Sequence, residues 1–238
     1  MFTKLGRAIT IAARDGGGDS ETNSALRLVI DKARQINMPT NNIDAAIKRG
    51  TGESDDGITI EKAVYGGYGP GGVAIVVDVT TDNKNRTVAE LRKIFEDGGG
   101  NLSEASSVLW QFREKGRVIV KSARILKGQK YGEKDEEVKV DRDELIIELM
   151  DVDGVEDIKE VGNGEDGFEY CEVITGTKDL MKVRNAIEQE GYILEDAELI
   201  KLAENLQRVD ESTKEKVNDL LESLSEHDDV DKVWDNMG

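Results

Sequence analysis

The apolar residues of this chain repeat with a helical period up to about residue 50 and with a strand period from about residue 58 onward. In the first stretch they recur at steps of three and four, which places them along one side of a helix. From Ile58 they alternate with polar residues, as in a strand with one buried face. The sequence therefore predicts a helical domain followed by domains that are built on sheets.

Three helices are expected in the helical part. The first ends at the glycine run 16–18, because consecutive glycines break a helix. The second follows Asn23 and stops before Pro39, since proline disfavours the helical conformation in the residue ahead of it. A third, short helix has Thr40 as its cap and ends at Gly50. The domain is expected to span residues 1–56.

A middle domain is expected to begin with two strands and a helix. The runs ITIEKAVYGGYGPGG and VAIVVDVT predict strands joined by a Gly-Pro-Gly turn, and TVAELRKIFEDGGG predicts the helix that follows. Further strands are expected in SSVLWQF, where Val108, Trp110 and Phe112 alternate, and in GRVIVKS. We interpret Trp110 and Phe112 as core residues. The polar segment 123–140 is interpreted as a connector.

The second half of the chain repeats the mixture of helices and strands. Helices are expected in DELIIELM, DLMKVRNAIEQEG and ESTKEKVNDLLESLSE, and strands in VEDIKEV, GFEYCEVIT, YILEDAELIKL and DVDKVWDN. Counted from the strand at Val73, the last helix and strand complete the split βαβ arrangement of a ferredoxin-like domain. The fold class is therefore α+β: a three-helix domain and two α/β domains with ferredoxin-like character. The middle one spans 57–122 plus 205–238, and 123–204 is inserted in it.

The composition of the chain argues against several functional classes. The formal net charge of −18 argues against indiscriminate coating of DNA, because the average surface repels phosphate. Cys171 and His227 are the only cysteine and histidine, so the sequence offers no Cys/His zinc site and no Ser-His-Asp set. We expect a non-enzyme without catalytic residues, metal or cofactor. With no apolar run of membrane-spanning length, we expect a cytoplasmic protein without a membrane partner.

Positive charge is concentrated near the N-terminus. Residues 1–50 carry a net charge of +3, so the remainder carries −21. Such asymmetry is typical of a chain in which one part contacts a polyanion. The candidate nucleic-acid contacts in this block are basic residues of the three helices: Lys4, Arg7, Arg14, Arg27, Lys32, Arg34, Lys48 and Arg49. The alternative is a solvated outer face, with Lys48 and Arg49 stabilising only the end of their helix.

A second candidate patch lies in TDNKNRT, just before the helix of the middle domain. Asn83, Lys84, Asn85 and Arg86 stand where backbone N–H groups at a helix start can bind an anion. The structural alternative is that Asn85 or Thr87 caps this helix.

Several motifs in order resemble the YebC family. They are FTKLGRAITIAARDGGGD, KARQINMPTNNIDAAIKRGTGE, the stretch from VYGGYGPGG through NRT to SSVLWQF, and the terminal DDVDKVW. The family includes probable bacterial transcriptional regulators and a mitochondrial translational activator of cytochrome oxidase. The resemblance implies three domains around a cleft of mixed charge, DNA-binding regulation in some members, and action on ribosomes elongating through proline-rich stretches in others.

This chain departs from the family pattern in two places. Family members usually have a further basic segment before FTKLGR, and we expect that a chain without it binds phosphate more weakly. AENLQRV stands where the family usually has Pro-Gln-Asn-Thr-Val before the last helix.

The function expected from the sequence is non-enzymatic regulation of gene expression through nucleic acid. The leading hypothesis is a DNA-binding transcriptional regulator. One alternative is a ribosome-associated translation factor that contacts ribosomal RNA, and another is a protein-interaction module in which the helices merely pack. No small-molecule substrate is expected. The recognised base sequence, the regulated genes and the oligomeric state are not encoded in any motif of the chain.

Overall fold

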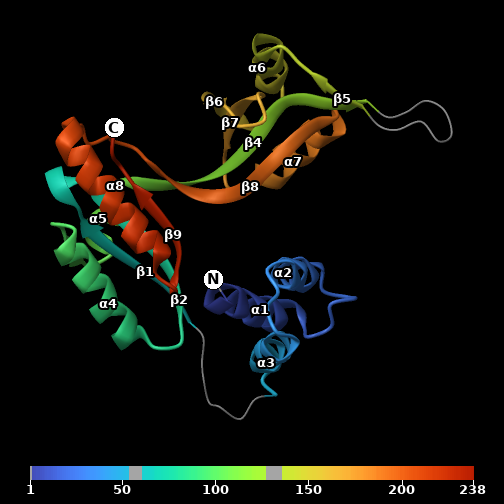
Figure 1. Ribbon diagram of the computed structural model, residues 1–238. Coiled ribbons are helices and arrows are strands. Elements are labelled where there is room, and N and C mark those ends of the chain that lie inside the picture. The colour runs from blue at the N-terminus through green and yellow to red at the C-terminus, as the bar shows by residue number, and fades with distance from the viewer. Residues whose placement is uncertain (1, 54–60, 127–135) are drawn as a thin grey trace. The chain divides into compact units, whose positions relative to one another are not determined.

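The computed structural model describes residues 2–53, 61–126 and 136–238, and these divide into two compact units. The first unit contains residues up to 111 together with 204–238, and the second contains 112–203. The fold is mixed α+β, with N-terminal helices followed by two separate β-sheets, as expected (Figure 1). The three-domain division with boundaries at 56, 122 and 204 stays a prediction.

The first unit begins with the three expected helices, α1 (Phe2–Gly16), α2 (Ser24–Gln35) and α3 (Thr40–Thr51). Asn23 joins the first two, because its side chain accepts from the backbone N–H of Leu26 and donates to the carbonyl of Ala12 at 2.7 Å. The helices share a small core of their own: Ile9, Ala13, Leu26, Ile30, Ala33, Met38, Ile43 and Ala46.

The ends of α3 differ from the expectation by one or two residues. Pro39, rather than Thr40, occupies the N-cap position, and the helix passes Gly50 to end at Thr51, with Gly52 as its C-cap in the left-handed conformation at a φ of 76°. Gly50 has a packing role instead, since a Cβ atom there would collide with the carbonyl oxygen of Thr10 on α1. This close approach brings α1 and α3 together.

The sheet of the first unit has the strand order β3-β1-β2-β9, with antiparallel neighbours. The hairpin of β1 (Glu61–Tyr68) and β2 (Ala74–Thr81) turns at Pro70–Gly72, as the sequence predicted. The part of the first strand expected at 58–60 lies outside the described residues. The remaining strands are β3 (Asn101–Ser103) and β9 (Val230–Asp235).

Two helices, α4 (Lys84–Asp97) and α8 (Glu211–Glu226), contribute to one core with this sheet. The core contains Val73, Ile75, Val77, Val79, Leu91, Phe95, Val217, Leu220, Leu224 and Val230. The spatial order of the strands matches a ferredoxin-like sheet, but β1 occupies the position that the strand count had given to GRVIVKS. That segment belongs to β4 (Phe112–Leu126) in the second unit.

The interpretation of SSVLWQF as a strand with Trp110 in the core was wrong. Residues Ser106–Leu109 form a short helix, α5, and Trp110 is 67% exposed. Its indole N–H donates to the carbonyl oxygen of Ser107, three residues earlier. Val108 and Phe112 are both buried and lie four residues apart, a spacing that also fits one face of a helical turn.

The second unit is an antiparallel sheet with the chain order strand, helix, strand, strand, helix, strand, which is ferredoxin-like. These elements are β4, α6 (Arg142–Met150), β6 (Val155–Asn163), β7 (Glu169–Thr175), α7 (Leu180–Gln189) and β8 (Tyr192–Ala203). Strand β4 pairs with β7 along one edge and with β8 along the other. The helices cover one face, over a core that includes Val118, Val173, Leu145 and Val183.

The segment interpreted as a connector is partly strand. β4 continues through Leu126, and β5 (Glu136–Lys139) pairs with its last four residues, whereas 127–135 lie outside the described residues. All four residues of β5 are exposed and three of them are charged, which explains why the composition of this stretch resembles a linker. Among the helices described in the three ranges, none is long and apolar enough to cross a membrane.

Candidate nucleic-acid interface

Two of the three predicted basic residues of α1, Lys4 and Arg7, bind other parts of the first unit. The Lys4 ammonium donates to the backbone carbonyl of Ser225 at 2.5 Å, and Arg14 forms an ion pair with its neighbour Asp15 at 3.3 Å. Arg7 donates through Nη1 to the carbonyl of Asp228 at 2.6 Å and through Nη2 to the carboxylate of Asp229 at 2.5 Å. The Arg7 side chain is only 10% exposed, so it is not presented to solvent in this arrangement.

The cations of α2 and α3 are more accessible. Arg27 is exposed and donates to the backbone carbonyls of Ser20 and Glu21, and these carbonyl groups carry no formal charge. Arg34 is 70% exposed and its nearest carboxylate, Asp31, lies at 3.8 Å. Lys32 and Lys48 are exposed, and within the described ranges neither side chain has a hydrogen-bonding or ionic partner. Arg49 is exposed at the end of α3.

The second predicted patch is mainly structural. Asn83 is the N-cap of α4, its Oδ1 accepting from the backbone N–H of Arg86 at 3.1 Å, so the cap is neither Asn85 nor Thr87. Lys84 forms an ion pair with Glu61, whose hydrogen bond raises the pKa of Lys84. Asn85 is exposed.

The two asparagines of this patch can be separated by experiment. We expect Asn83→Ala to lower the free energy of unfolding by about 1 kcal/mol, because the first turn of α4 loses its side-chain acceptor. Asn85→Ala is the matched control and should change it by less than about 0.5 kcal/mol. Urea unfolding followed by tryptophan fluorescence measures both. Equal losses in the two variants would contradict the assignment of the cap.

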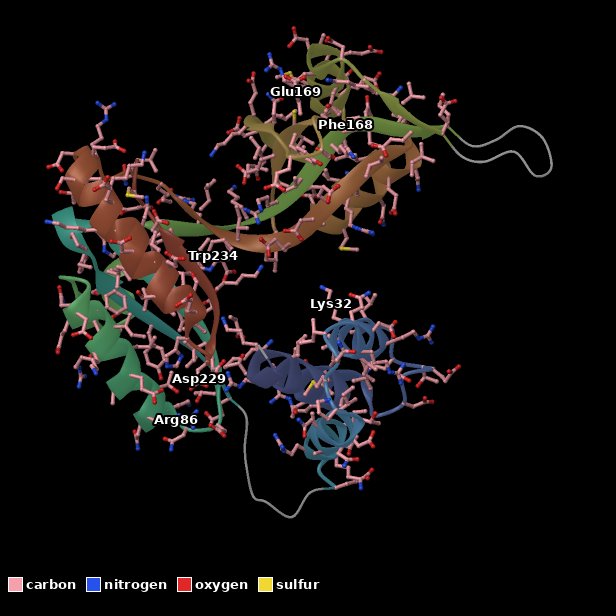
Figure 2. The ribbon with its side chains drawn as sticks, in the orientation of Figure 1. Lys32, Arg86, Phe168, Glu169, Asp229 and Trp234 are labelled. Carbon is pink, nitrogen blue, oxygen red and sulfur yellow. The ribbon has the colours of Figure 1, made fainter. Side chains whose placement is uncertain are left out.

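Arg86 joins the two predicted patches through one carboxylate. Its Nη2 lies 3.0 Å from Oδ2 of Asp229, while Nη2 of Arg7 reaches the other oxygen of the same group. Figure 2 shows Arg86 on α4 beside Asp229 at the start of β9. The hydroxyls of Thr81 and Thr87 also donate to Asp229, at 2.9 and 2.5 Å.

Asp229 is the centre of this network and the sequence analysis missed it. The residue is 2% exposed, and burial alone would raise its pKa. Hydrogen bonds from Thr87, Arg86 and Thr81 and the charge of Arg7 outweigh burial and lower the pKa of Asp229 to about 2. Its partners lie more than 140 positions away in the sequence, so no local motif could reveal the group.

The surroundings of His227 contain the one group of potential metal ligands among the described residues. Oxygen or nitrogen atoms of Glu90, His227 and Asp229 lie within 4.8 Å of one another, and His227 Nε2 is 3.0 Å from Glu90. Asp229 already binds two guanidinium groups, whose charge repels a cation. The arrangement therefore favours an ion-pair network over a metal centre.

Cys171 lies in the core of the second unit, on β7. Burial raises the pKa of its thiol, which disfavours the reactive thiolate. This is the environment of a structural cysteine rather than of a nucleophile.

Comparisons with known proteins agree on one family. A family model described as the TACO1/YebC protein N-terminal domain matches residues 1–53, and one described as the TACO1/YebC second and third domain matches 60–237. A protein from Dictyoglomus turgidum is 44% identical over 236 residues, covering 99% of this chain and 86% of that protein. A protein from Chlorobaculum tepidum is 41% identical over 237 residues, with 100% and 86% covered. Both are named probable transcriptional regulatory proteins.

A solved structure extends the likeness to three dimensions. The crystal structure of a conserved hypothetical protein from Aquifex aeolicus matches with a TM-score of 0.73 and 36% identity, covering 100% of this chain and 88% of that one. Sequence and structure thus agree from the N-terminal helices to the last strand, and the chain belongs to the TACO1/YebC family.

Proposed function

We propose that this protein is a non-enzymatic, cytoplasmic regulator of gene expression that binds nucleic acid through cations of its N-terminal helices. The observation that carries the proposal is the accessible charge of α2 and α3. Lys32 and Lys48 have no partner among the described residues, and the charge of Arg27 meets only backbone carbonyls. A phosphate can therefore bind these groups without first breaking an ion pair.

The names of the relatives support a regulatory role. Proteins that align over almost the whole chain are called probable transcriptional regulatory proteins, which favours DNA as the target. Of the predicted contacts, we propose for phosphate the exposed cations of α2 and α3, whether or not they also have a partner within the protein: Arg27, Lys32, Arg34, Lys48 and Arg49. Lys4, Arg7, Arg14, Lys84 and Arg86 already bind groups of the protein, and Asn83 caps a helix.

Ribosomal RNA is the second candidate target, and the net charge favours it. A net of −18 on the chain gives little non-specific affinity for duplex DNA, so a target that also offers protein contacts suits this charge distribution. Action on the ribosome as a translation factor would follow from that choice. The two targets share the phosphate chemistry and differ in the form of the nucleic acid.

The test replaces the two unpartnered lysines. Lys32→Gln combined with Lys48→Gln should weaken binding and lower the slope of log Kd against log salt by about 1.5, since each lost phosphate contact removes about 0.7 to 0.9. Fluorescence anisotropy with labelled duplex DNA and labelled single-stranded RNA measures the slope, and the tighter ligand identifies the target class.

The matched control replaces two exposed lysines of the helices that pack on the first sheet. Lys93→Gln with Lys214→Gln removes the same charge from α4 and α8 and should leave the slope unchanged. If both double variants lose affinity equally, the contact is unspecific attraction to net charge. If neither does, a protein-interaction module becomes the better hypothesis.

A further inference from the structure

The polar face of α1 binds the C-terminal end of α8 and the residues that follow it. Three side-chain nitrogens of Lys4 and Arg7 reach acceptors on Ser225, Asp228 and Asp229, at 2.5 to 2.6 Å. The acceptors are two backbone carbonyls and one carboxylate within five residues of chain. Both donors were predicted from the sequence to contact phosphate.

The end of α8 attracts cations from elsewhere in the unit. The last carbonyls of a helix have no partner inside the helix and carry partial negative charge, which basic residues in the last turn usually offset. The last turn of α8 contains no basic residue. Lys4 and Arg7 supply the missing positive charge from α1.

The contact can open without exposing a core. The apolar cluster of α1, α2 and α3 and the cluster between the sheet and α4 and α8 share no residue. A hollow of about 520 Å³ lies where Ala8, Ile11 and Ala12 of α1 face Thr80 and Asp231. Little apolar surface therefore opposes the separation of the two parts.

Asp229 remains satisfied when Arg7 leaves. Its carboxylate keeps the hydrogen bonds from Arg86, Thr81 and Thr87, so no buried charge is left alone. The carbonyls of Ser225 and Asp228 lie near the surface end of α8, where water can replace the cations. Release therefore costs far less than breaking an isolated buried ion pair.

We propose that Lys4 and Arg7 form a reversible latch that holds α1 against the end of α8, and that nucleic-acid phosphates compete with Ser225, Asp228 and Asp229 for these two side chains. The competition between phosphate and the protein acceptors rests on the proposed function, in which this protein binds nucleic acid. In the closed form, Lys4 and Arg7 are not available to phosphate. The apparent affinity for nucleic acid therefore falls in proportion to the fraction of molecules that are open. Weakening the acceptor side should then strengthen binding.

The latch itself is tested without nucleic acid, by the distance between spin labels. Asn41→Cys on α3 and Ala89→Cys on α4 introduce exposed labelling sites, and the native Cys171 is buried. Electron–electron double resonance should give a narrow distance distribution for the otherwise unchanged protein and a broad, longer one for Arg7→Gln. If the double variant Arg7→Gln with Lys4→Gln still gives a narrow distance distribution, the latch is overturned.

The competition is tested by adding ligand and by changing the acceptor. Duplex DNA or single-stranded RNA that binds by anisotropy should broaden the distribution, and Asp229→Asn should bind the same ligand about threefold tighter or more. Binding that leaves the distribution narrow, or weaker binding by Asp229→Asn with intact tryptophan fluorescence, overturns the competition. Absence of any binding overturns the proposed function, whereas the response of Arg7→Gln still decides whether the contact holds α1.

Discussion

Replacing Asp229 with alanine is expected to lower the free energy of unfolding of the first unit by about 3 kcal/mol, because the change leaves two guanidinium groups without their shared carboxylate. Thr81 and Thr87 lose an acceptor as well. Arg86 is partly exposed and regains water, so the loss falls at the lower end of the range for a broken buried pair. Trp110 and Trp234 both lie in the first unit, so urea unfolding followed by tryptophan fluorescence reports on that unit.

Asp228→Ala is the matched control for this variant. Asp228 is exposed, and its contribution to the network is its backbone carbonyl, which alanine keeps. We expect a change of less than about 0.5 kcal/mol. If Asp229→Ala were as stable as Asp228→Ala, the network around Asp229 would not contribute to stability.

Phe95→Ala is expected to destabilise the same unit by about 3 to 5 kcal/mol, because it leaves a cavity in the core between the sheet and the helices α4 and α8. Phe95 is fully buried and is the largest side chain in that core. Its ring lies directly against Gly67 of β1, where a Cβ atom would stand 2.5 Å from the ring carbon Cε1. Gly67 has no side chain that could move in to fill the space, so the cavity is expected to persist.

Phe95→Leu separates the size of the side chain from its position. Leucine keeps most of the buried apolar volume and should cost about 1 kcal/mol. The same fluorescence-monitored unfolding measures both variants. Comparable, small losses for alanine and leucine would mean that the core collapses around residue 95 and that the packing against Gly67 does not hold.

Helix breaks and strand alternation predicted most of the fold. The glycine run 16–18, Asn23 and Pro39 mark boundaries that depend only on local backbone chemistry, and the structure confirms all three helices. The hairpin that turns at Pro70–Gly72 also depends on local backbone chemistry, and the structure confirms it. The place of β1 between β3 and β2 could not be predicted, because pairing between β1 and β3 depends on contacts distant in sequence.

A short apolar run does not distinguish a strand from a helical turn. In SSVLWQF the buried residues Val108 and Phe112 satisfy both an alternating and a helical spacing. In the structure the segment is helical, with the backbone N–H of Leu109 donating to the carbonyl of Ala105, and Val108 packs close to Gly66 of β1. Trp110 consequently lies on the surface, although its size and apolar character are typical of a core residue.

The sequence predicts the cationic residues of the candidate site but not the groups that they bind. The sequence names Lys4, Arg7 and Arg14 as candidate contacts of α1, yet it carries no information about which groups of the folded chain these side chains bind. Arg7 reaches Asp229, which is 222 positions away. The sequence therefore predicts which residues are cationic, and the structure shows which of them are buried against the protein, as Arg7 is, and which are exposed, as Lys32 and Lys48 are.

The most direct test of phosphate binding by the N-terminal helices is the salt dependence of the unmodified protein's affinity for single-stranded RNA and duplex DNA. We expect log Kd to rise linearly with log salt with a slope of about 4, if Arg27, Lys32, Arg34, Lys48 and Arg49 each neutralise one phosphate. A slope near zero, or no binding to either ligand at low salt, would contradict the proposal.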